Sequence, residues 1–535
     1  MEYSRVQLND LSDEILMIIL KKLSNVQVLY SLIGVNKRLN KIVYDSIFTN
    51  CLTLMVSFLN HCIFPLSEPI LDRFCLQILP KIHNKIEWLD LEAFSMERIL
   101  RATNYPNLYG FSLYNIQQEI AMHLFNDECP FTRTFKNQIL SLAISINANE
   151  EQSSRKDINA RIFMRIINTF SYLRFLNFCP SLNWCQELSF DNSFPIVFSS
   201  TLLKLYVCLH HFTDCLYLLD GRFNQLRILY VTINIISSSN LIINNQLKLP
   251  NLRSFSLYCH RKTGAYDELI VPLLHRMSDL EELDLCLIVS RKKIFIDGND
   301  LKTNIINNMT LLNKFTFNIR SLSRFYNQIN FPSNKDIQHT FDGFKDNQII
   351  SCIDYFQKRN YGQCHMYSYP YKLKYYDNIT NNFPGGIFKC VRTISLFDER
   401  PFEHEFFLQI SQSFPLIEKL TLINKKPQIN KFNEQSKDDN RPLLIVIQYP
   451  HLFELNLIKT HEDYLEQFLL DTKMCLPNSI FLHINYQLLK EVTHNFTRNS
   501  TRNNCAKIRV IFLYNTLGFP EHLKDYFPHA KICSL

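Results

Sequence analysis

The sequence predicts an α/β fold in which short strands alternate with helices, preceded by a helical N-terminal region. An apolar triplet of the form L-x-x-L-x-L recurs from Ile86 onward, and most neighbouring triplets lie 22 to 35 residues apart. This interval suits one strand and one helix per unit. Hydrophobic residues make up 46% of the 535 residues, which favours a chain that is folded throughout. Segments with helical periodicity lie between the triplets, at 94–104, 156–169, 266–277, 403–414, 464–474 and 487–496.

The N-terminal region contains a run of six apolar residues from Ile15 to Leu20. Ser12 is a suitable N-cap, acidic residues follow it, and lysines come after the run, so a helix is predicted over 13–23. Apolar side chains surround this helix nearly completely. One face can therefore pack on its own domain while another needs cover by a partner. Two more short helices are predicted over 28–33 and 35–43, and a glycine separates them.

Three stretches of this region have the order and spacing of a known helical module: Leu8-Asn9-Asp10-Leu11-Ser12-Asp13-Glu14-Ile15-Leu16, Ile19-Leu20-Lys21-Lys22-Leu23 and Leu32-Ile33-Gly34-Val35-Asn36-Lys37-Arg38-Leu39. They resemble an F-box, the adaptor-binding module of SCF-type ubiquitin ligases. Two positions depart from the family, which usually has proline in place of Ser12 and often tryptophan in place of Leu39. The resemblance implies that residues 4–50 dock onto the S-phase-kinase-associated adaptor, which tethers the chain to a cullin scaffold. The implied contact residues are Leu8, Leu11, Ser12, Ile15, Leu16, Ile19, Leu20, Val35 and Leu39.

The chain from 85 to 535 repeats its local pattern. Several triplets follow an aromatic residue or leucine and then proline, as in Tyr105-Pro106, Leu249-Pro250, Phe414-Pro415 and Tyr449-Pro450. A proline there ends the preceding helix before the next strand begins. The pattern resembles an irregular leucine-rich-repeat solenoid, a common companion of an F-box, although the family's asparagine or cysteine after the third leucine is missing. A helical connector is expected over 51–84, and an insertion around 320–388, where the interval between triplets is too long for one unit.

The residues between the triplet leucines are the candidates for target binding. In such a repeat the leucines point into the core, and the intervening residues line one exposed face. Aromatic side chains dominate interface energetics, so an exposed aromatic residue on this face is a suitable anchor. Four acidic residues within 279–284 form a compact patch that could bind a target. The alternative interpretation is that they are ordinary solvent-exposed residues at strand edges. The expected target-binding residues are Trp88, Asp90, Tyr258, Glu282 and Asp284.

Several classes of function have no signal in the sequence. Phosphate-binding loops of the G-x-x-x-x-G-K-[ST] or G-x-G-x-x-G type do not occur, nor do the H-E-x-x-H and G-x-S-x-G motifs. The 16 cysteines form no C-x-x-C pair, and the group of His210, His211, Asp214 and Cys215 near Cys208 lies in an apolar run that favours packing over metal binding. We therefore expect no metal, no cofactor and no catalytic residue.

Charge and hydropathy limit the expected partners. The net charge of +7 is spread thinly over the chain, which does not favour nucleic-acid binding. Charged residues interrupt the N-terminal apolar run, and no long apolar stretch follows, so neither a secretion signal nor a membrane span is expected. The expected compartment is the cytosol or the nucleus.

These features predict a non-catalytic substrate-recognition subunit of an SCF-type ubiquitin ligase, whose F-box binds the adaptor and whose repeats capture an unknown target protein. One alternative is an F-box scaffold or regulatory protein that acts outside ubiquitin transfer. A third possibility is a stand-alone enzyme whose site carries no recognisable motif.

Overall fold

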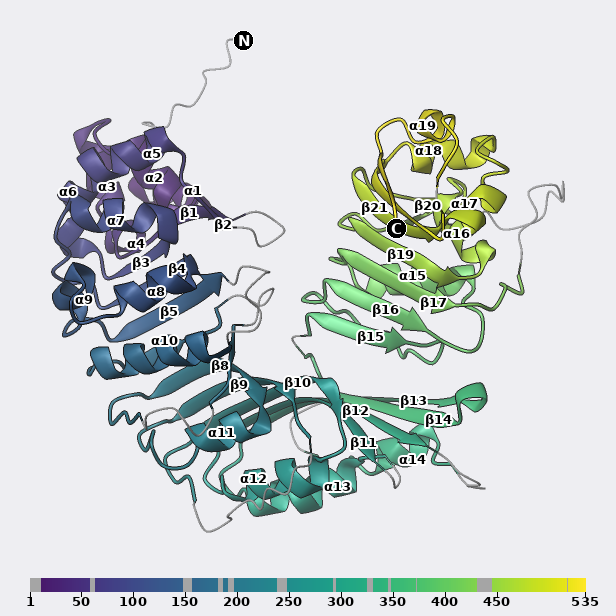
Figure 1. Cartoon of the computed structure of the whole chain (residues 1–535), viewed down its shortest axis with the longest axis horizontal. Coiled ribbons are helices and arrows are strands. Elements are labelled where there is room, and N and C mark those ends of the chain that lie inside the picture. Colours follow the sequence, from purple (N-terminus) through teal and green to yellow (C-terminus); the bar gives the residue numbers. More distant parts are fainter. Residues whose placement is uncertain are drawn as a thin grey trace. The chain divides into compact units, whose positions relative to one another are not determined.

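The computed structural model describes residues 11–57, 63–147, 156–180, 186–190, 197–237, 248–291, 295–324, 331–344, 348–371, 373–430, 445–516 and 518–535. The fold is mixed α/β, and its largest sheet is mostly parallel. The chain divides into two compact units, which are drawn in sequence colours in Figure 1. One comprises residues 1–288 and 302–315, and the other comprises residues 289–301 and 316–535.

Four short helices begin the described part of the first unit: α1 (Asp13–Leu20), α2 (Asn25–Leu32), α3 (Lys37–Val43) and α4 (Ser46–Thr49). Side-chain caps set the starts of α2, α3 and α4, whereas Ser12 takes the N-cap position of α1 without a side-chain cap hydrogen bond. Ser24 and Gln27 form a capping box at α2, and the Asn36 side chain accepts a hydrogen bond from the Leu39 amide, which starts the third helix at residue 37 rather than 35. Gly34 breaks the chain between α2 and α3 with φ of 86°, a left-handed conformation that glycine adopts without strain.

The strands of the first unit lie in the order β2-β1-β3-β4-β5-β6-β8-β9-β10-β11, with β7 also paired to β8. From β1 to β10, neighbouring strands pair in parallel. Strand β2 pairs antiparallel with β1. The bounds are β1 (Cys51–Ser57), β2 (Ile63–Pro65), β3 (Trp88–Glu92), β4 (Gly110–Gln117), β5 (Ser141–Asn147), β6 (Phe175–Asn177), β7 (Glu187–Leu188), β8 (Lys204–His211), β9 (Ile228–Ile235), β10 (Ser254–Thr263) and β11 (Glu282–Arg291).

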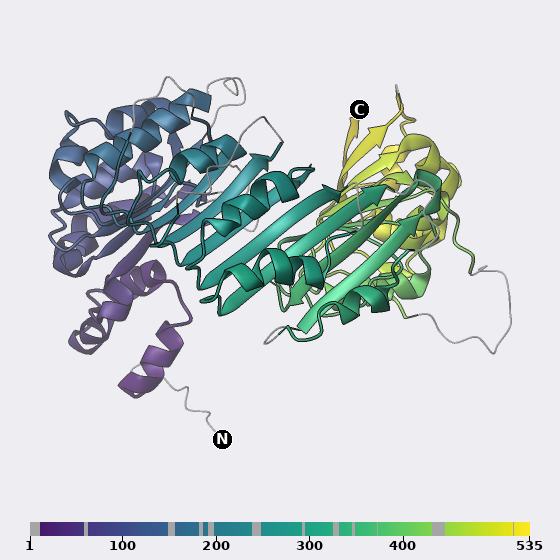
Figure 2. The ribbon, with the colours of Figure 1, turned by 90° about the horizontal axis from the view of Figure 1, so that it is seen from below.

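Helices connect these strands and gather along one side of them, as Figures 1 and 2 show. The helical segments are α5 (Glu68–Arg73), the π-helix Phe74–Ile78, α6 (Leu79–Ile82), the 3-10 helix His83–Lys85, α7 (Ala93–Ala102), α8 (Gln118–Leu124), α9 (Pro130–Phe135), α10 (Lys156–Thr169), α11 (Phe212–Leu218), the π-helix Tyr266–Ile270, α12 (Val271–His275), α13 (Gly298–Asn304) and the 3-10 helix Ile306–Asn308.

No helix among the described residues has the length and apolar character that a membrane crossing requires.

The predicted alternation of strands and helices with buried triplet leucines is confirmed. In β3 the leucines at 89 and 91 are buried while Trp88 and Asp90 are half-buried, the period-two pattern of a strand with one covered face. Of the residues in the thirteen triplets, only Leu312 is not buried. The parallel register places the central leucine or phenylalanine of successive triplets opposite one another, in the row Leu89, Phe111, Leu142, Leu176, Leu205, Leu229 and Phe255.

The tyrosine-proline sequences ahead of two triplets join each strand to the helix before it. The Tyr105 hydroxyl donates a 2.6 Å hydrogen bond to the Ile99 carbonyl of α7, and the Tyr449 hydroxyl donates one of 2.9 Å to the Phe407 carbonyl of α15 (His404–Ser413). Both phenols are buried, and burial raises the pKa of each above its usual value. Each tyrosine therefore satisfies a helix carbonyl while it fills the core.

One expectation about the connections needs correction. The segment 51–84 is not helical throughout, because Cys51–Ser57 forms strand β1, which pairs in parallel with β3. Leu52 and Leu54 alternate into the core there, a strand pattern hidden in a longer apolar run. The segment 320–388, which was expected to be an insertion, supplies an antiparallel hairpin and a further strand that pairs in parallel.

The strands of the second unit are of two kinds, antiparallel and parallel. The antiparallel strands lie in the order β13-β14-β12, and seven parallel strands follow in the order β15-β16-β17-β19-β21-β22-β23, beside the short pair β18-β20. The strands are β12 (Lys314–Arg324), β13 (Gln348–Phe356), β14 (Tyr361–Tyr369), β15 (Tyr375–Ile379), β16 (Thr393–Phe397), β17 (Lys419–Asn424), β18 (Ile447–Gln448), β19 (Glu454–Thr460), β20 (Met474–Cys475), β21 (Ile480–Asn485), β22 (Ile508–Tyr514) and β23 (Lys531–Ser534). The remaining helices are α14 (Asn334–His339), the 3-10 helix Gln357–Arg359, α16 (Glu462–Leu469), α17 (Tyr486–Val492), the 3-10 helix Asn499–Thr501, α18 (Arg502–Cys505) and α19 (Leu523–Tyr526).

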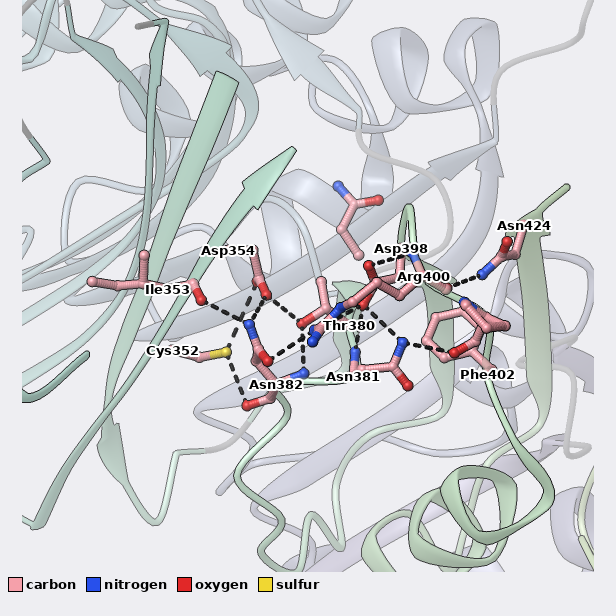
Figure 3. Close-up of polar contacts among 12 residues, drawn as sticks. Cys352, Ile353, Asp354, Thr380, Asn381, Asn382, Asp398, Arg400, Phe402 and Asn424 are labelled. Atoms are coloured by element: carbon pink, nitrogen blue, oxygen red, sulfur yellow. Dashed lines mark hydrogen bonds and ion pairs between the residues drawn. The ribbon is translucent and has the colours of Figure 1, made fainter. Parts of the chain in front are cut away.

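A buried polar junction joins the hairpin to the parallel strands of this unit (Figure 3). The Asp354 carboxylate of β13 accepts hydrogen bonds from the Thr380 hydroxyl at 2.7 Å, the Asn382 amide at 2.9 Å and the Gln363 amide at 3.1 Å. On the other side, both nitrogens of Asn381 donate to Asp398. Burial raises the pKa of Asp354, while the hydrogen bonds from Thr380, Gln363 and Asn382 oppose that shift. The loop that follows β15 is therefore fixed from both sides.

Candidate functional site

Helix α1 presents an apolar surface to solvent. Ile15, Ile18 and Ile19 are 47%, 63% and 41% exposed, and their spacing of three and four residues places them on one helical face. The opposite face is anchored in the core by Leu16 and Leu20, of which Leu16 is 0% exposed. This one helix thus has both a packing face and an uncovered apolar face, the arrangement of a helix that binds a partner.

The residues that the F-box resemblance assigned to the adaptor divide between these two faces. Ile15, Ile19 and Val35 are exposed apolar residues, Ser12 is exposed and Leu11 is half-buried. Leu16, Leu20 and Leu39 are buried inside the helical region, where they pack the core instead of offering a contact surface. Leu8 lies outside the described residues. Ile18 lies in the same apolar run and was not among the predicted contact residues, although it is the most exposed isoleucine of α1.

Arg38 of α3 holds the start of α1. Its guanidinium forms an ion pair of 2.8 Å with Asp13 and also donates to the Leu11 carbonyl. The carbonyl lies just ahead of the helix, so one side chain fixes both the entry of the chain and the first turn of α1. This contact orients the face that carries Ile15 and Ile19.

The helical region is part of the first unit and is not an isolated cap. The Asn25 side chain of α2 donates to the carbonyls of Ile47 at 3.2 Å and Cys51 at 2.9 Å, which links α2 to the start of β1. Arg73 of α5 donates to the Ile33 carbonyl, and its guanidinium lies 4.7 Å from the centre of the Tyr30 ring. Substitutions in the core of these helices therefore also disturb their packing on the sheet.

The open face of the sheet in the first unit carries the predicted target-binding residues, in two separate places. Trp88 and Asp90 lie on β3, where the Trp88 indole donates a 2.8 Å hydrogen bond to Asp90, and the Thr53 hydroxyl donates to the same carboxylate at 2.8 Å. The Trp88 ring lies over Gly110, so that a Cβ at Gly110 would come within 2.3 Å of it. Trp88 thus has a fixed orientation, which reduces the entropy that it would lose on binding.

The second place is at β10 and β11. The Tyr258 hydroxyl is hydrogen-bonded to the Asp284 carboxylate, and Glu282 accepts a 3.3 Å hydrogen bond from Ser254 and forms an ion pair of 3.5 Å with Lys314. Six strand spacings separate β3 from β10. At ~4.8 Å per spacing, the two places are roughly 29 Å apart. The structure therefore joins Trp88 to Asp90 and Tyr258 to Asp284, but it does not bring the two pairs together.

An aromatic strip that sequence analysis missed lies between these two places. The Tyr206 ring of β8 stacks on the Tyr230 ring of β9 with 4.4 Å between centroids, and it contacts the Phe175 ring of β6 at 5.5 Å. All three side chains are half-buried. Burial and the neighbouring Tyr230 raise the pKa of Tyr206 to about 12. Each residue directly precedes a buried triplet residue, so the period-two pattern that identified Trp88 and Asp90 also applies to them.

The parallel sheet of the second unit has its own mixed open face. Lys419 of β17 forms an ion pair of 2.6 Å with Glu454 of β19, and the His483 ring of β21 stacks on Phe512 of β22 with 4.4 Å between centroids. Burial lowers the pKa of His483. This face combines charge and aromatic surface in a way that suits a polar protein partner.

The side chains that could hold a metal already have protein partners. His461, Glu462 and Asp463 come close enough to share an ion, but the Asp463 carboxylate accepts a 2.8 Å hydrogen bond from the Gln428 amide, and His461 Nδ1 accepts one from the Asp463 amide. In the group near Cys208, the His210 ring is hydrogen-bonded to Glu187, and Asp214 accepts from the amides of Phe190 and His211. These contacts explain both groups as parts of the packed structure.

A cavity of about 540 Å³ lies among α7, α8 and α9 in the first unit. Its lining is mainly apolar, with Met96, Ile120 and Phe131, and includes Arg101 and His123. Arg101 is paired with Glu97 at 2.6 Å on the helix surface. The cavity lies on the helical side of the sheet, so none of the predicted target-binding residues lines it. No protein-family model matches the chain, and no curated protein matches it.

Proposed function

We propose that the chain is a substrate receptor of an SCF-type ubiquitin ligase, in which α1 to α3 bind the S-phase-kinase-associated adaptor and an open sheet face captures the target protein. Such a receptor carries out no chemistry. It holds the target at high effective concentration near the transfer machinery that the cullin scaffold recruits.

The observation that carries this proposal is the uncovered apolar face of α1. Ile15 and Ile19 are exposed in a helix that Leu16 and Leu20 anchor in the core, and Val35 adds a third exposed apolar side chain before α3. These residues occupy positions that the F-box resemblance assigns to adaptor contact. Exposed apolar residues grouped on one helical face indicate a protein interface more than isolated ones do.

The repeated strand and helix units support the second half of the proposal. Thirteen apolar triplets occur along the chain, and parallel strands of the first unit place the central residues of seven of them in register. The open face then displays one side chain from each strand in every row, which suits recognition of an extended protein surface. The stacked rings of Tyr206 and Tyr230 between the two predicted anchors give this face a central aromatic contact.

The test measures binding of the full-length chain to the purified adaptor by isothermal titration calorimetry. Truncation of both Ile15 and Ile19 to alanine removes exposed apolar contacts, and we expect a loss of about 2 kcal/mol or more, roughly 30-fold in affinity. A matched control is the Ile387→Ala and Ile429→Ala variant, because both isoleucines are exposed and lie in the second unit. The control should bind as tightly as the parent.

A parent chain that does not bind the adaptor, or a double variant at 15 and 19 that binds as tightly as the parent, would overturn the proposed contact. The ligase role needs a second measurement. Co-purification of the cullin with the full-length chain and adaptor supports a receptor that acts in ubiquitin transfer. Adaptor binding without cullin supports the alternative of an F-box scaffold.

A further inference from the structure

Two cysteine side chains from distant parts of the sequence meet beside β8 in the first unit. The Sγ atoms of Cys179 and Cys208 are 3.1 Å apart, although the residues are separated by 29 positions. Cys208 is buried and Cys179 is partly exposed, and neither is part of a disulfide bond. The sulfurs are in contact, and a shift of about 1 Å would bring them to the ~2.05 Å of a disulfide bond.

The strand arrangement holds the two thiols together. Cys208 lies in β8 with the same alternation as Tyr206 and His210, which places it on the open face of the sheet. Strand β6 ends at Asn177 opposite Tyr206, but the next amide, that of Phe178, still donates a 2.8 Å hydrogen bond to the Tyr206 carbonyl. The Cys179 amide then donates to the Asn177 side chain at 3.1 Å. These backbone contacts determine where Cys179 leaves the sheet, which is directly beside Cys208.

We propose that Cys179 and Cys208 form a redox-sensitive dithiol site that a hydroperoxide converts to a disulfide. The partly exposed Cys179 sulfur attacks the O–O bond of hydrogen peroxide, which gives a sulfenic acid and one water. The Cys208 sulfur then attacks the sulfenic sulfur, forms the S–S bond and releases a second water. In total, two thiols lose two hydrogen atoms, and one peroxide is reduced to two waters. A dithiol reductant reverses the reaction by exchange.

The difference in exposure assigns the two roles. Peroxide reaches Cys179 from solvent, whereas Cys208 is covered and acts as the resolving thiol. Other cysteines of the chain serve as internal references. Cys215 is fully buried, and burial raises its pKa to about 12, so it should stay reduced. Cys390 is exposed and should be modified singly.

The site lies next to the aromatic strip of Phe175, Tyr206 and Tyr230, because Asn177 and Tyr206 face each other across the β6 and β8 pair. A bond between Cys179 and Cys208 would fix residues 178–180 against this part of the open face. The chemistry depends only on the two thiols and is therefore independent of adaptor binding.

The test uses the native full-length protein with one equivalent of hydrogen peroxide. Free thiols are then alkylated, the protein is digested without reductant, and the peptides are identified by mass spectrometry. We expect a linked peptide that joins Cys179 to Cys208 and a loss of two titratable thiols per chain, restored by dithiothreitol. Alkylation of both residues as free thiols while Cys390 is oxidised would overturn the proposal. Conversion of Cys179 to sulfinic acid without the linked peptide would also overturn it.

Two single variants test the order of the steps. In Cys208→Ser, the sulfenic acid at Cys179 cannot be resolved, so dimedone labelling of Cys179 should rise above the level in the parent chain. In Cys179→Ser, Cys208 should remain alkylatable after peroxide treatment. Cys390→Ser is the matched control and should still form the linked peptide. If either test variant fails to fold, the linked peptide in the parent chain still decides the proposal.

Discussion

The Thr380 hydroxyl donates a 2.7 Å hydrogen bond to the buried Asp354 carboxylate, and so joins the end of β15 to strand β13. A buried carboxylate requires such donors, because its charge is otherwise uncompensated. Replacing Thr380 by valine keeps the shape of the side chain and removes the donor. We expect the free energy of unfolding to fall by about 1.5–3 kcal/mol, the usual range for a hydrogen bond to a charged group.

Urea unfolding of the parent and Thr380→Val chains measures this loss. Thr421→Val is the matched control, because it makes the same change of side chain at a different place. Thr421 is half-buried on the open face of β17. An equal loss in both variants would show that the loss comes from the general cost of replacing threonine and not from the Asp354 junction.

His365 makes the second unit sensitive to acid. Its ring is buried and donates a 2.6 Å hydrogen bond to the Asn318 side chain, and burial, aided by the charge of Arg320, lowers its pKa well below the usual value of about 6.5. The folded chain therefore keeps His365 neutral at pH values where the unfolded chain protonates it. Stability from this residue is present above about pH 6.5 and is lost as the pH falls toward the folded pKa, at up to about 1.4 kcal/mol per pH unit.

The measurement compares urea unfolding between pH 7.5 and 5.5 for the parent and for His365→Gln. Glutamine cannot be protonated, so the variant should lose less stability over this range than the parent does. His529→Gln is the control, because His529 is exposed. Equal pH dependence in the parent and in His365→Gln would refute the assignment.

Truncation of Leu16 and truncation of its exposed neighbours on α1 should have different effects. The first should lower stability, and the second should weaken adaptor binding. Leu16 is fully buried, so Leu16→Ala should lower the free energy of unfolding by about 2–5 kcal/mol. The exposed pair Ile15 and Ile19 should change stability by no more than about 0.5 kcal/mol per residue when truncated, while adaptor binding falls. Thermal unfolding and calorimetric binding on the same protein samples separate the two effects. Loss of stability in the Ile15 and Ile19 variant would place these residues in the core instead.

Gly110 determines how Trp88 lies on the open face. A Cβ at position 110 would come within 2.3 Å of the Trp88 ring, so Gly110→Ala must displace the indole from its place beside Asp90. The chain has two tryptophans, and Trp184→Phe leaves Trp88 as the only tryptophan, whose emission can be excited selectively over that of tyrosine. In that background, we expect Gly110→Ala to shift the emission to longer wavelength as the ring becomes more hydrated. Gly518→Ala, where nothing lies within 4 Å of the added atom, should leave the spectrum unchanged.

Much of the fold could be predicted because burial follows the apolar triplets closely. A strand with one covered face must alternate, so residues such as Leu89 and Leu91 identify β3 without further information. Strand β1 was missed because its alternating leucines lie within a longer apolar run, which fits a helix equally well. The hairpin of β13 and β14 was missed because buried polar residues such as Asp354 and His365 interrupt its pattern, and their partners lie elsewhere in the chain.

The candidate surfaces were harder to predict for a similar reason. Helix α1 has apolar residues on nearly every side, and only the packing of the domain decides that Leu16 turns inward and Ile15 outward. The contact between Cys179 and Cys208 depends on where β6 ends relative to β8, which no local pattern encodes.

The parallel register has a consequence for how a ligand reads the open face. Asp90, Ser112, Asn177, Tyr206 and Tyr230 lie in one row across the strands, yet each comes from a different strand and helix unit. A ligand that crosses the strands therefore touches residues that are never neighbours in sequence. No short synthetic peptide cut from the chain can reproduce that surface, and an antibody raised against such a peptide would not block it. Changes in the length of a helical connection leave the row intact, whereas deletion of one whole unit removes a single residue from every row and brings its flanking residues together.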